Sequence, residues 1–335
     1  MMSKIGILLT NTGTPDAPTT GAVRRYLREF LSDKRIVQLP RLLWLPILYG
    51  LILPLRPRRS AKLYQHIWLE NDSPMRVYMN RLAQLLPSSL GERIAQVEIG
   101  MNYGNPSIKE ALHRFHENGI EEILVLPLFP QYSNTTTASS IDRLLKAVNA
   151  LPATPRINGV KSYATHPDYL AALASAINAY WSANGRHAHL LISFHGIPKR
   201  YVKAGDPYEI ECEATANLLA KALQLGDDQW TLCYQSQFGY DKWLTPSTQR
   251  LLLELPQRGI DTLDIVCPGF AVDCLETLEE IAITGEENFK KAGGNSLRYL
   301  PALNDSHIHA TMLAAIIESH FKAKSHLPIE RLYSI

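Results

Sequence analysis

Residues 119–130 read GIEEILVLPLFP, and a second stretch at residues 259–270 reads GIDTLDIVCPGF. Both begin with Gly-Ile and an acidic residue and continue into a short apolar run, which is typical of a buried strand. A second pair lies at a similar spacing: residues 163–180, YATHPDYLAALASAINAY, resemble residues 303–320, LNDSHIHATMLAAIIESH, in kind and place. Two matches at one offset predict that the chain contains two similar halves, joined near residues 160–185.

Apolar runs that are typical of strands recur along the whole chain. They alternate with longer segments whose apolar residues are spaced three or four apart, as in helices. The runs lie at residues 4–11, 97–103, 121–130, 160–164, 189–196, 229–236, 262–270 and 297–303. Strands that alternate with helices favour βαβ units and parallel sheets. We therefore predict an α/β protein with two similar doubly wound, Rossmann-like parallel-sheet halves that face a central cleft.

The first half is expected to cover residues 1–165 and to include an apolar lip segment at 36–60. The second half, residues 166–335, would end in a helix that either stays with it or packs back on the first half. In open α/β sheets, ligands bind outside the carboxyl ends of the strands. The loops that follow the predicted strands are therefore where a site is expected.

Composition and charge exclude several classes of protein. The 335 residues carry a formal net charge of only +2, so the chain lacks the basic footprint of a nucleic-acid-binding protein. The four cysteines form no CxxC pair, which argues against a disulfide framework, and no secretory leader follows Met1. The strand-end loops contain neither common phosphate-binding motif, so no nucleotide cofactor is expected. We expect a protein of the reducing cytosol.

Residues 42–55, LLWLPILYGLILPL, form an apolar stretch that is too short to span a bilayer as a helix. Pro46 and Pro54 interrupt or bound it. Two interpretations stay open: a bent, buried helix, or an apolar lip that meets a lipid surface or a greasy ligand. The flanking arginines suit both an interface and an anionic ligand.

His195 follows the apolar run LISF and precedes Gly-Ile-Pro, so it lies where a buried strand ends. A histidine at this place can take up or release a proton near neutral pH, or bind a metal through its neutral ring. The alternative is a loop histidine whose nitrogens are satisfied by hydrogen bonds.

Three carboxylates follow the strand predicted at 262–270. Asp273, Glu276 and Glu280 are spaced i, i+3 and i+7, which places them on one face of a helix. Acidic residues also favour the first turn of a helix because of its dipole, and this is the alternative for Asp273 and Glu276. Carboxylate oxygens together with an imidazole suit Fe(II) or Zn(II), and a row of carboxylates also suits proton transfer.

Aromatic residues gather in the same loops. Phe129, Tyr132, Tyr240, Trp243 and Phe270 all follow predicted strands. They are either core residues or the walls of a pocket for a flat hydrophobic ligand, since ligand pockets are mostly apolar with a few polar groups.

Four long segments resemble the signature segments of the ferrochelatases (protohaem ferro-lyases) of bacterial type. These segments are LPLFPQYSNTTTASS, SFHGIPKRY, YQSQFGYDKWLTP and CPGFAVDCLETLEEI, and the resemblance extends to NTGTPDAPTTGAVRRYLREFLSD, GMNYGNPSIKEAL and YLPALN. It implies a lyase of haem biosynthesis that inserts Fe2+ into protoporphyrin IX. The product would be protohaem, formed with release of two protons, in the last step of the pathway.

The resemblance also implies roles for individual residues. His195 and Glu276 would be the catalytic pair and the metal ligands, facing each other across the cleft. Asp273 and Glu280 would form a proton path. The porphyrin-binding residues would be Asn11, Thr12, Tyr132, Ser133, Trp243 and Phe270, with Arg59 and Ser73 placed to meet the propionates.

No prosthetic group is implied, because Fe2+ and protoporphyrin IX are substrates. Some relatives carry an iron–sulfur cluster on a cysteine-rich set. No cluster is expected here, because the cysteines of this chain lack close spacing: Cys212, Cys233, Cys267 and Cys274. No nucleic-acid partner is expected, whereas peripheral membrane contact, and a monomer or a homodimer, stay open.

Two departures from the family pattern motivate one alternative function, and the two-half architecture that other chelatases share motivates a second. Asn71 and Asp72 stand where a glycine pair usually precedes Ser-Pro, and Thr12 stands where relatives carry Leu or Met. One alternative is a non-catalytic tetrapyrrole-binding paralogue, which would bind porphyrin without inserting metal. The other is a cobalt or nickel chelatase that acts on a different tetrapyrrole.

Overall fold

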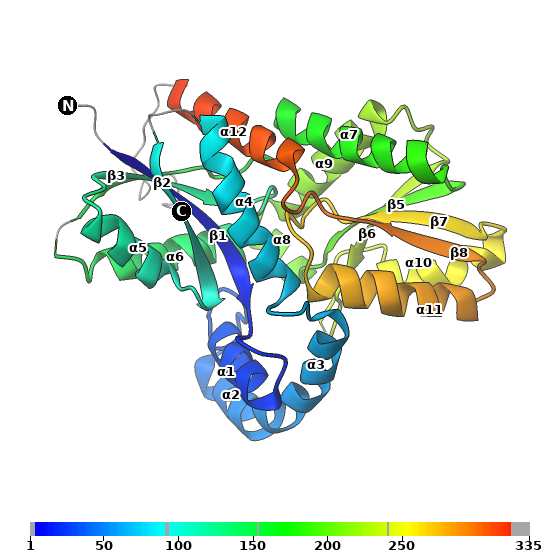
Figure 1. Cartoon of the computed structure of the whole chain (residues 1–335). Coiled ribbons are helices and arrows are strands. Elements are labelled where there is room, and N and C mark those ends of the chain that lie inside the picture. The colour runs from blue at the N-terminus through cyan, green and yellow to red at the C-terminus, as the bar shows by residue number, and fades with distance from the viewer. Residues whose placement is uncertain (1–3, 91–93, 153, 240, 323–335) are drawn as a thin grey trace. The chain divides into compact units, whose positions relative to one another are not determined.

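The computed structural model describes residues 4–90, 94–152, 154–239 and 241–322. The chain divides into two compact units (Figure 1). Unit 1 contains residues up to Phe129, Ser133–Ser162 and the chain from Asp305 onward, and unit 2 contains Pro130–Tyr132 and Tyr163–Asn304. The main division of the chain lies between Ser162 and Tyr163.

Unit 1 is built on a parallel sheet with strand order β2-β1-β3-β4. Its strands are β1 (Ile5–Thr14), β2 (Ile94–Gly104), β3 (Glu122–Pro127) and β4 (Arg156–Gly159). Helices α5 and α6 lie on one side of this sheet and α4 on the other (Figure 1). The helices of the unit are α1 (Thr20–Leu31), α2 (Arg41–Ile47), η1 (Leu48–Ile52), α3 (Leu53–Ile67), α4 (Pro74–Leu90), α5 (Ile108–Glu117), α6 (Thr137–Val148) and α12 (His307–Lys322).

Unit 2 repeats this arrangement with strand order β6-β5-β7-β8, again parallel. Its strands are β5 (His189–His195), β6 (Trp230–Gln235), β7 (Thr262–Val266) and β8 (Ser296–Leu300). Helices α7 and α9 pack together, as do α10 and α11 (Figure 1). The helices of the unit are α7 (Pro167–Asn184), α8 (Lys199–Lys203), α9 (Tyr208–Ala222), α10 (Thr248–Glu254), η2 (Pro256–Arg258), η3 (Leu275–Ile283) and α11 (Thr284–Lys291).

The shared strand order confirms the predicted fold class and the internal repeat. The two Gly-Ile stretches lead into β3 and β7, and each of these is the third strand of its sheet. The second matched pair also occupies equivalent positions in the two sheets' connections, because α7 follows β4 and α12 follows β8. Helix α7 belongs to unit 2 although β4 belongs to unit 1, and α12 belongs to unit 1 although β8 belongs to unit 2. Within unit 1, α12 packs on α4.

Seven of the eight predicted apolar runs contain a strand, and the run at 160–164 was wrong. These residues lie outside regular structure, and β4 is the preceding segment Arg156–Gly159. Its sequence, Arg-Ile-Asn-Gly, has one apolar side chain, so it carries no hydrophobic signal. It becomes a strand because it pairs with β3 at the edge of the sheet.

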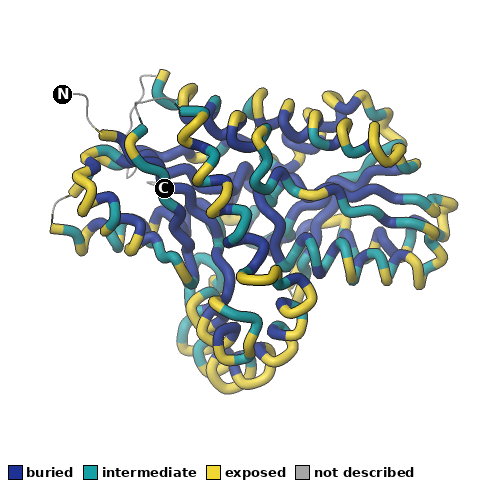
Figure 2. Tube along the Cα trace, in the orientation of Figure 1, coloured by how far each residue is buried: buried dark blue, intermediate teal, exposed yellow. Residues whose placement is uncertain are grey.

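The core of each unit lies between its sheet and its helices. In unit 1, Leu8 and Val125 of the sheet pack with Phe115 of α5. In unit 2, Leu191 and Ile265 pack with Phe289 of α11. Figure 2 shows the sheet strands as mainly buried, whereas the outer faces of the helices are exposed. This packing buries the strands and leaves their carboxyl ends as the places where polar side chains emerge.

The apolar stretch at 42–55 lies within a bent helical segment formed by α2, η1 and α3. We call residues 42–55 the lip. Pro46 lies inside α2, and the chain continues as the π-helix η1 before α3 begins at Leu53. Leu48 is fully buried, but Leu42 is 90% exposed, so the interpretation as a buried helix is wrong for most of the segment. The other exposed apolar side chains are Leu43, Ile47, Tyr49, Leu51 and Leu55. None of the described helices is long and apolar enough to span a bilayer.

Candidate active site

His195 is the last residue of β5, and its side chain is half-buried. Its Nδ1 lies 2.7 Å from the backbone oxygen of Gly196. Because a carbonyl only accepts hydrogen bonds, this contact assigns the ring proton to Nδ1 and leaves the lone pair of the neutral ring on Nε2. Nε2 is therefore the atom that can bind a metal or accept a proton.

Gly196 has a steric reason to follow this histidine. A Cβ at this position would lie 2.9 Å from the backbone oxygen of Gln235 and 3.3 Å from Cε3 of Trp243. The backbone N–H of Gly196 donates to the same Gln235 oxygen at 2.8 Å. The His-Gly pair thus lets β5 end against β6 without a side chain in between.

The carboxylates lie on a π-helix, which corrects the regular helix that the sequence spacing implied. Helix η3 begins at Leu275, so Asp273 precedes it, and the helix carries Glu276 and Glu280. A π-helix closes i→i+5 hydrogen bonds and has wider turns, and it is frequent at functional sites. Glu276 and Glu280, four residues apart, therefore lie closer to one another around the axis than an α-helical turn would place them.

Asp273 does not share a face with the other two carboxylates. It is buried, and one of its oxygens accepts hydrogen bonds from the hydroxyls of Tyr299 at 2.6 Å and Thr277 at 2.9 Å. Its other oxygen accepts from Asn304 at 2.7 Å. These contacts hold the segment that leads into η3, a structural task that the spacing did not reveal, and a place for Asp273 on a proton path stays a prediction.

Glu280 is held from two elements. The backbone N–H and the hydroxyl of Ser236, just after β6, donate to its two oxygens at 2.8 and 2.5 Å. The side-chain amide of Gln249, on α10, also donates to it. Burial raises the pKa of Glu280, although the hydrogen bonds from Ser236 and the charge of a protonated His195 act to lower it.

Glu280 interacts electrostatically with His195 and Glu276. The pKa of Glu280 responds to both other residues, since the charge on Glu276 raises it and the charge on His195 lowers it. Across the described ranges, however, no three His, Cys, Asp or Glu side chains form a ready-made metal centre.

The predicted porphyrin-binding residues are distributed over the two units. In unit 2, Trp243 and Phe270 are half-buried, and Tyr132 is only 1% exposed. The Trp243 ring packs against Phe238, with ring centroids 4.9 Å apart. Tyr240 lies outside the described residues.

In unit 1, Asn11 and Thr12 lie near the end of β1, and the Asn11 side chain accepts from the Thr12 N–H at 2.7 Å. Ser73 and Ser133 are fully buried, whereas Arg59 is exposed on α3.

Sequence reasoning missed the residues that hold the carboxylates in place. Gln235 and Ser236 lie within the quoted segment YQSQFGYDKWLTP, and Gln249 lies on α10. Amides and hydroxyls have no spacing pattern of their own, so only their place at the end of a predicted strand could have marked the first two.

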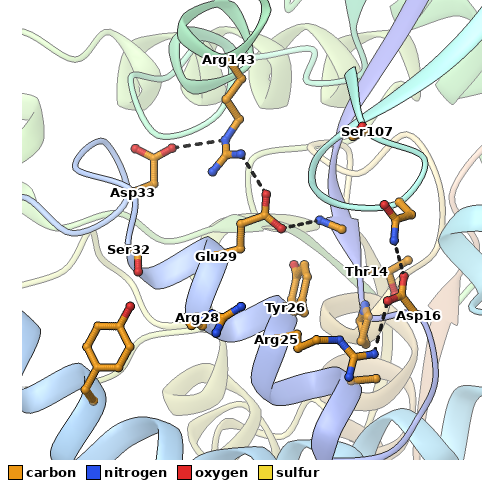
Figure 3. A pocket seen from close by; sticks show the side chains of 15 residues that line it. Thr14, Asp16, Arg25, Tyr26, Arg28, Glu29, Ser32, Asp33, Ser107 and Arg143 are labelled. Carbon is orange, nitrogen blue, oxygen red and sulfur yellow. Dashed lines mark hydrogen bonds and ion pairs between the residues drawn. The ribbon is translucent and has the colours of Figure 1, made fainter. Parts of the chain in front are cut away.

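A cavity of about 540 Å3 lies in unit 1, at the ends of β1 and β2, and none of the predicted site residues lines it. Most of its charged side chains are paired with one another (Figure 3). Arg143 contacts Glu29 at 3.0 Å and Asp33 at 3.6 Å, and Arg25 contacts Asp16 at 3.6 Å.

Comparisons with known proteins identify one family. The family model named Ferrochelatase matches residues 4–321. The chain is 48% identical to a ferrochelatase of Vibrio cholerae over 94% of this chain and 98% of that one, and 45% identical to one of Marinomonas sp. over 96% and 98%. Among solved structures, SirB from Bacillus subtilis with Fe3+ covers 96% of this chain and 98% of its own, with a TM-score of 0.57 at 12% identity. That last likeness concerns the fold alone.

Proposed function

The chain belongs to the ferrochelatase family and inserts Fe2+ into protoporphyrin IX, and from this premise we propose which of its residues carry out the reaction. Insertion exchanges the two inner N–H protons of the ring for one Fe2+, so two protons must leave for each metal that enters. The site therefore needs a base near the ring nitrogens, a ligand that delivers the metal and an exit for protons.

His195 and Glu276 are the catalytic pair in this proposal. Nε2 of His195 accepts a pyrrole proton or holds the metal, and the carboxylate of Glu276 is its partner. An imidazole and a carboxylate match the ligand preference of Fe(II). Glu280 takes the proton onward, because its raised pKa makes it a better proton acceptor than an ordinary glutamate.

One observation supports the proposal most strongly. The carboxylate of Glu280 lies within electrostatic reach of both His195 and Glu276, so the three titratable groups form one cluster at the end of β5. Clusters of titratable groups with perturbed pKa values are frequent at catalytic sites.

For the porphyrin, the proposal names residues in each unit. Trp243 and Phe270 offer half-buried aromatic surface, and Asn11 and Thr12 offer polar groups near the end of β1. The exposed guanidinium of Arg59 would meet a propionate. Tyr132, Ser73 and Ser133 are too buried to offer much surface, so we expect them to support the residues that touch the ring.

We propose further that the chain holds no iron–sulfur cluster. All four cysteines are buried, and burial raises the pKa of every one of their thiols. Cluster ligands are thiolates, which such surroundings disfavour. The purified protein should lack the visible absorption of a cluster and keep full activity; a cluster found after anaerobic purification would contradict this.

The lip is proposed to contact a lipid surface. Its exposed apolar side chains Leu42, Leu43 and Leu55 stand near arginines, a composition that suits the boundary between acyl chains and anionic headgroups. Vesicles of phosphatidylethanolamine with phosphatidylglycerol should co-sediment with the protein, and the double variant Leu42→Asp/Leu43→Asp should lose this binding. Leu253→Asp, at an exposed leucine of α10, is the control. Equal binding of all three proteins would reject the contact.

The catalytic pair is tested by His195→Ala and Glu276→Gln in a metal-insertion assay that follows porphyrin absorbance. Each should lower kcat by about 100-fold or more, since general acid–base groups contribute 10²–10⁴-fold. Glu287→Gln, at an exposed glutamate of α11, is the matched control and should behave as wild type. Full activity in both pair variants would reject the assignment.

A further inference from the structure

Gln235 is a buried polar residue whose side-chain nitrogen and oxygen both form hydrogen bonds. It is completely inaccessible at the end of β6. Its Nε2 donates to the backbone oxygen of Glu276 at 2.7 Å, and its Oε1 accepts from the hydroxyl of Ser193 at 2.9 Å and from the thiol of Cys267 at 3.2 Å. A flipped amide would place two oxygens against each other at Glu276, so this orientation is the one that satisfies all partners.

These contacts join the elements that carry the catalytic pair. Gln235 is the direct register partner of His195 on the neighbouring strand, and its backbone oxygen accepts from the N–H of Gly196. Ser193 lies two residues before His195 on β5, and Cys267 directly follows β7. One side chain therefore ties three strand ends to the first turn of the π-helix η3.

The bond to Glu276 is the one that bears on the reaction. The carbonyl of Glu276 lies in the first turn of η3, so its bond to Gln235 fixes the main chain that carries the catalytic carboxylate. The next residue, Ser236, holds Glu280 in the same helix. Two consecutive residues at the end of β6 thus bind η3 at positions four residues apart. Catalytic geometry is lost with displacements of about 0.5 Å, so such anchors matter to function as well as to stability.

We propose that Gln235 is a positioning residue that sets the distance between the imidazole of His195 and the carboxylate of Glu276, and thereby the strength with which the pair holds the incoming metal. It acts through Glu276 and touches neither metal nor porphyrin. The proposal rests on the roles proposed above for His195 and Glu276.

The first test is Gln235→Met, which keeps the length of the side chain and removes its hydrogen bonds. With Zn2+ or Fe2+ as substrate, KM for the metal should rise about tenfold or more and kcat should fall, because residues that orient a ligand typically affect metal affinity by 10–100-fold. KM for the porphyrin should stay within about twofold. Gln257→Met, at an exposed glutamine of η2, is the control and should leave both constants unchanged.

A second variant keeps the test decisive if Gln235→Met does not fold. Gln235→Glu retains oxygens for Ser193 and Cys267, and in its ionised form it presents a carboxylate oxygen to the carbonyl of Glu276. Because a buried carboxyl is protonated at low pH and can then donate to that carbonyl, KM for the metal should rise with pH as the introduced carboxyl ionises. A residue that only stabilises the fold would lower Tm and leave KM for the metal unchanged in the folded enzyme, and this result in either variant would overturn the proposal.

The same assay also distinguishes an error in the proposed catalytic pair from an error in the role of Gln235. If His195→Ala and Glu276→Gln keep full activity in the same assay, the catalytic pair itself is wrong. If both lose activity while Gln235→Met and Gln235→Glu match wild type, only the positioning role is rejected.

Discussion

Ser236 donates to both oxygens of Glu280, from its backbone N–H at 2.8 Å and from its hydroxyl at 2.5 Å. Its φ of 62° lies in the left-handed region, which is costly for a residue other than glycine. Strained backbone of this kind persists where the surroundings impose it, often at functional sites. Here the strained turn after β6 aims two donors at one buried carboxylate.

Removal of the Ser236 hydroxyl should therefore shift the titration of Glu280. Its hydrogen bond lowers the pKa of Glu280, so Ser236→Ala should raise that pKa further. Because Glu280 accepts protons only in its ionised form, the acidic limb of the pH profile of kcat should move to higher pH. At pH 7 kcat should fall by roughly tenfold or less. Ser182→Ala, at an exposed serine of α7, is the control, and an unmoved acidic limb in Ser236→Ala would speak against the proton path.

The raised pKa of Glu280 also predicts how stability depends on pH. A carboxyl whose pKa is raised in the folded state, here mainly by burial, favours folding below the unfolded value of 4.5, and this contribution is lost as pH rises through the folded pKa. Glu280→Gln cannot ionise and keeps its contribution. The variant should thus gain stability relative to wild type as pH increases from about 4 to about 8, while it loses activity. Urea unfolding at both pH values measures this, and a difference that stays constant or shrinks would contradict it.

Much of the fold could be predicted because it depends on local patterns. The apolar runs that became β1, β3, β5 and β7 are short, bounded by turn residues and buried, so hydrophobic periodicity finds them. β4 could not be found, because an edge strand with one apolar residue depends on its neighbour for its structure.

Candidate site residues could be predicted from the sequence only where the side chain is titratable or can bind a metal. His195 ends an apolar run, Glu276 lies in the segment that follows another, and both belong to long family motifs. The π-helix was not predictable, because a spacing of i, i+3 and i+7 reads as α-helical until the backbone is seen. Asp273 was placed with the other carboxylates for this reason, although it binds Tyr299 and Asn304 instead.

Gly196 provides a steric test of the link between β5 and β6. The Cβ of Gly196→Ala would lie 2.9 Å from the backbone oxygen of Gln235, which belongs to a strand and cannot move freely. We expect a loss of about 1–3 kcal/mol in the free energy of unfolding and a fall in kcat of more than about tenfold, because the shift displaces His195. In Gly21→Ala the added carbon would lie 4.0 Å from its nearest neighbour, so this control should match wild type. Wild-type kcat in Gly196→Ala would show that the site tolerates movement of this strand end.

The acid at position 72, one of the departures from the family pattern, is already neutralised within unit 1. Arg76, whose side chain is 10% exposed, donates through Nε to both oxygens of Asp72 at 2.8 and 2.7 Å. The same guanidinium donates to the backbone oxygens of Asn105 at 3.0 Å and Pro15 at 3.2 Å. Arg76 therefore anchors the loops at the ends of β1 and β2, and Asp72, which is paired with Arg76, does not present a free charge to a propionate.

Substitutions at Arg76 and Asp72 should therefore affect the stability of the fold more than the binding of the porphyrin. Arg76→Met should lower the free energy of unfolding by about 2–4 kcal/mol, since it leaves one carboxylate and two carbonyls without their donor. Asp72→Gly should cost less, about 1–2 kcal/mol, and should change KM for the porphyrin by less than about threefold. Arg81→Met, on the exposed side of the same helix, should cost under 1 kcal/mol, because its ion pair with Asp305 is a surface contact. Urea unfolding and steady-state kinetics measure the two effects, and a KM for the porphyrin that falls more than threefold in Asp72→Gly would show that the charge of Asp72 does oppose the substrate.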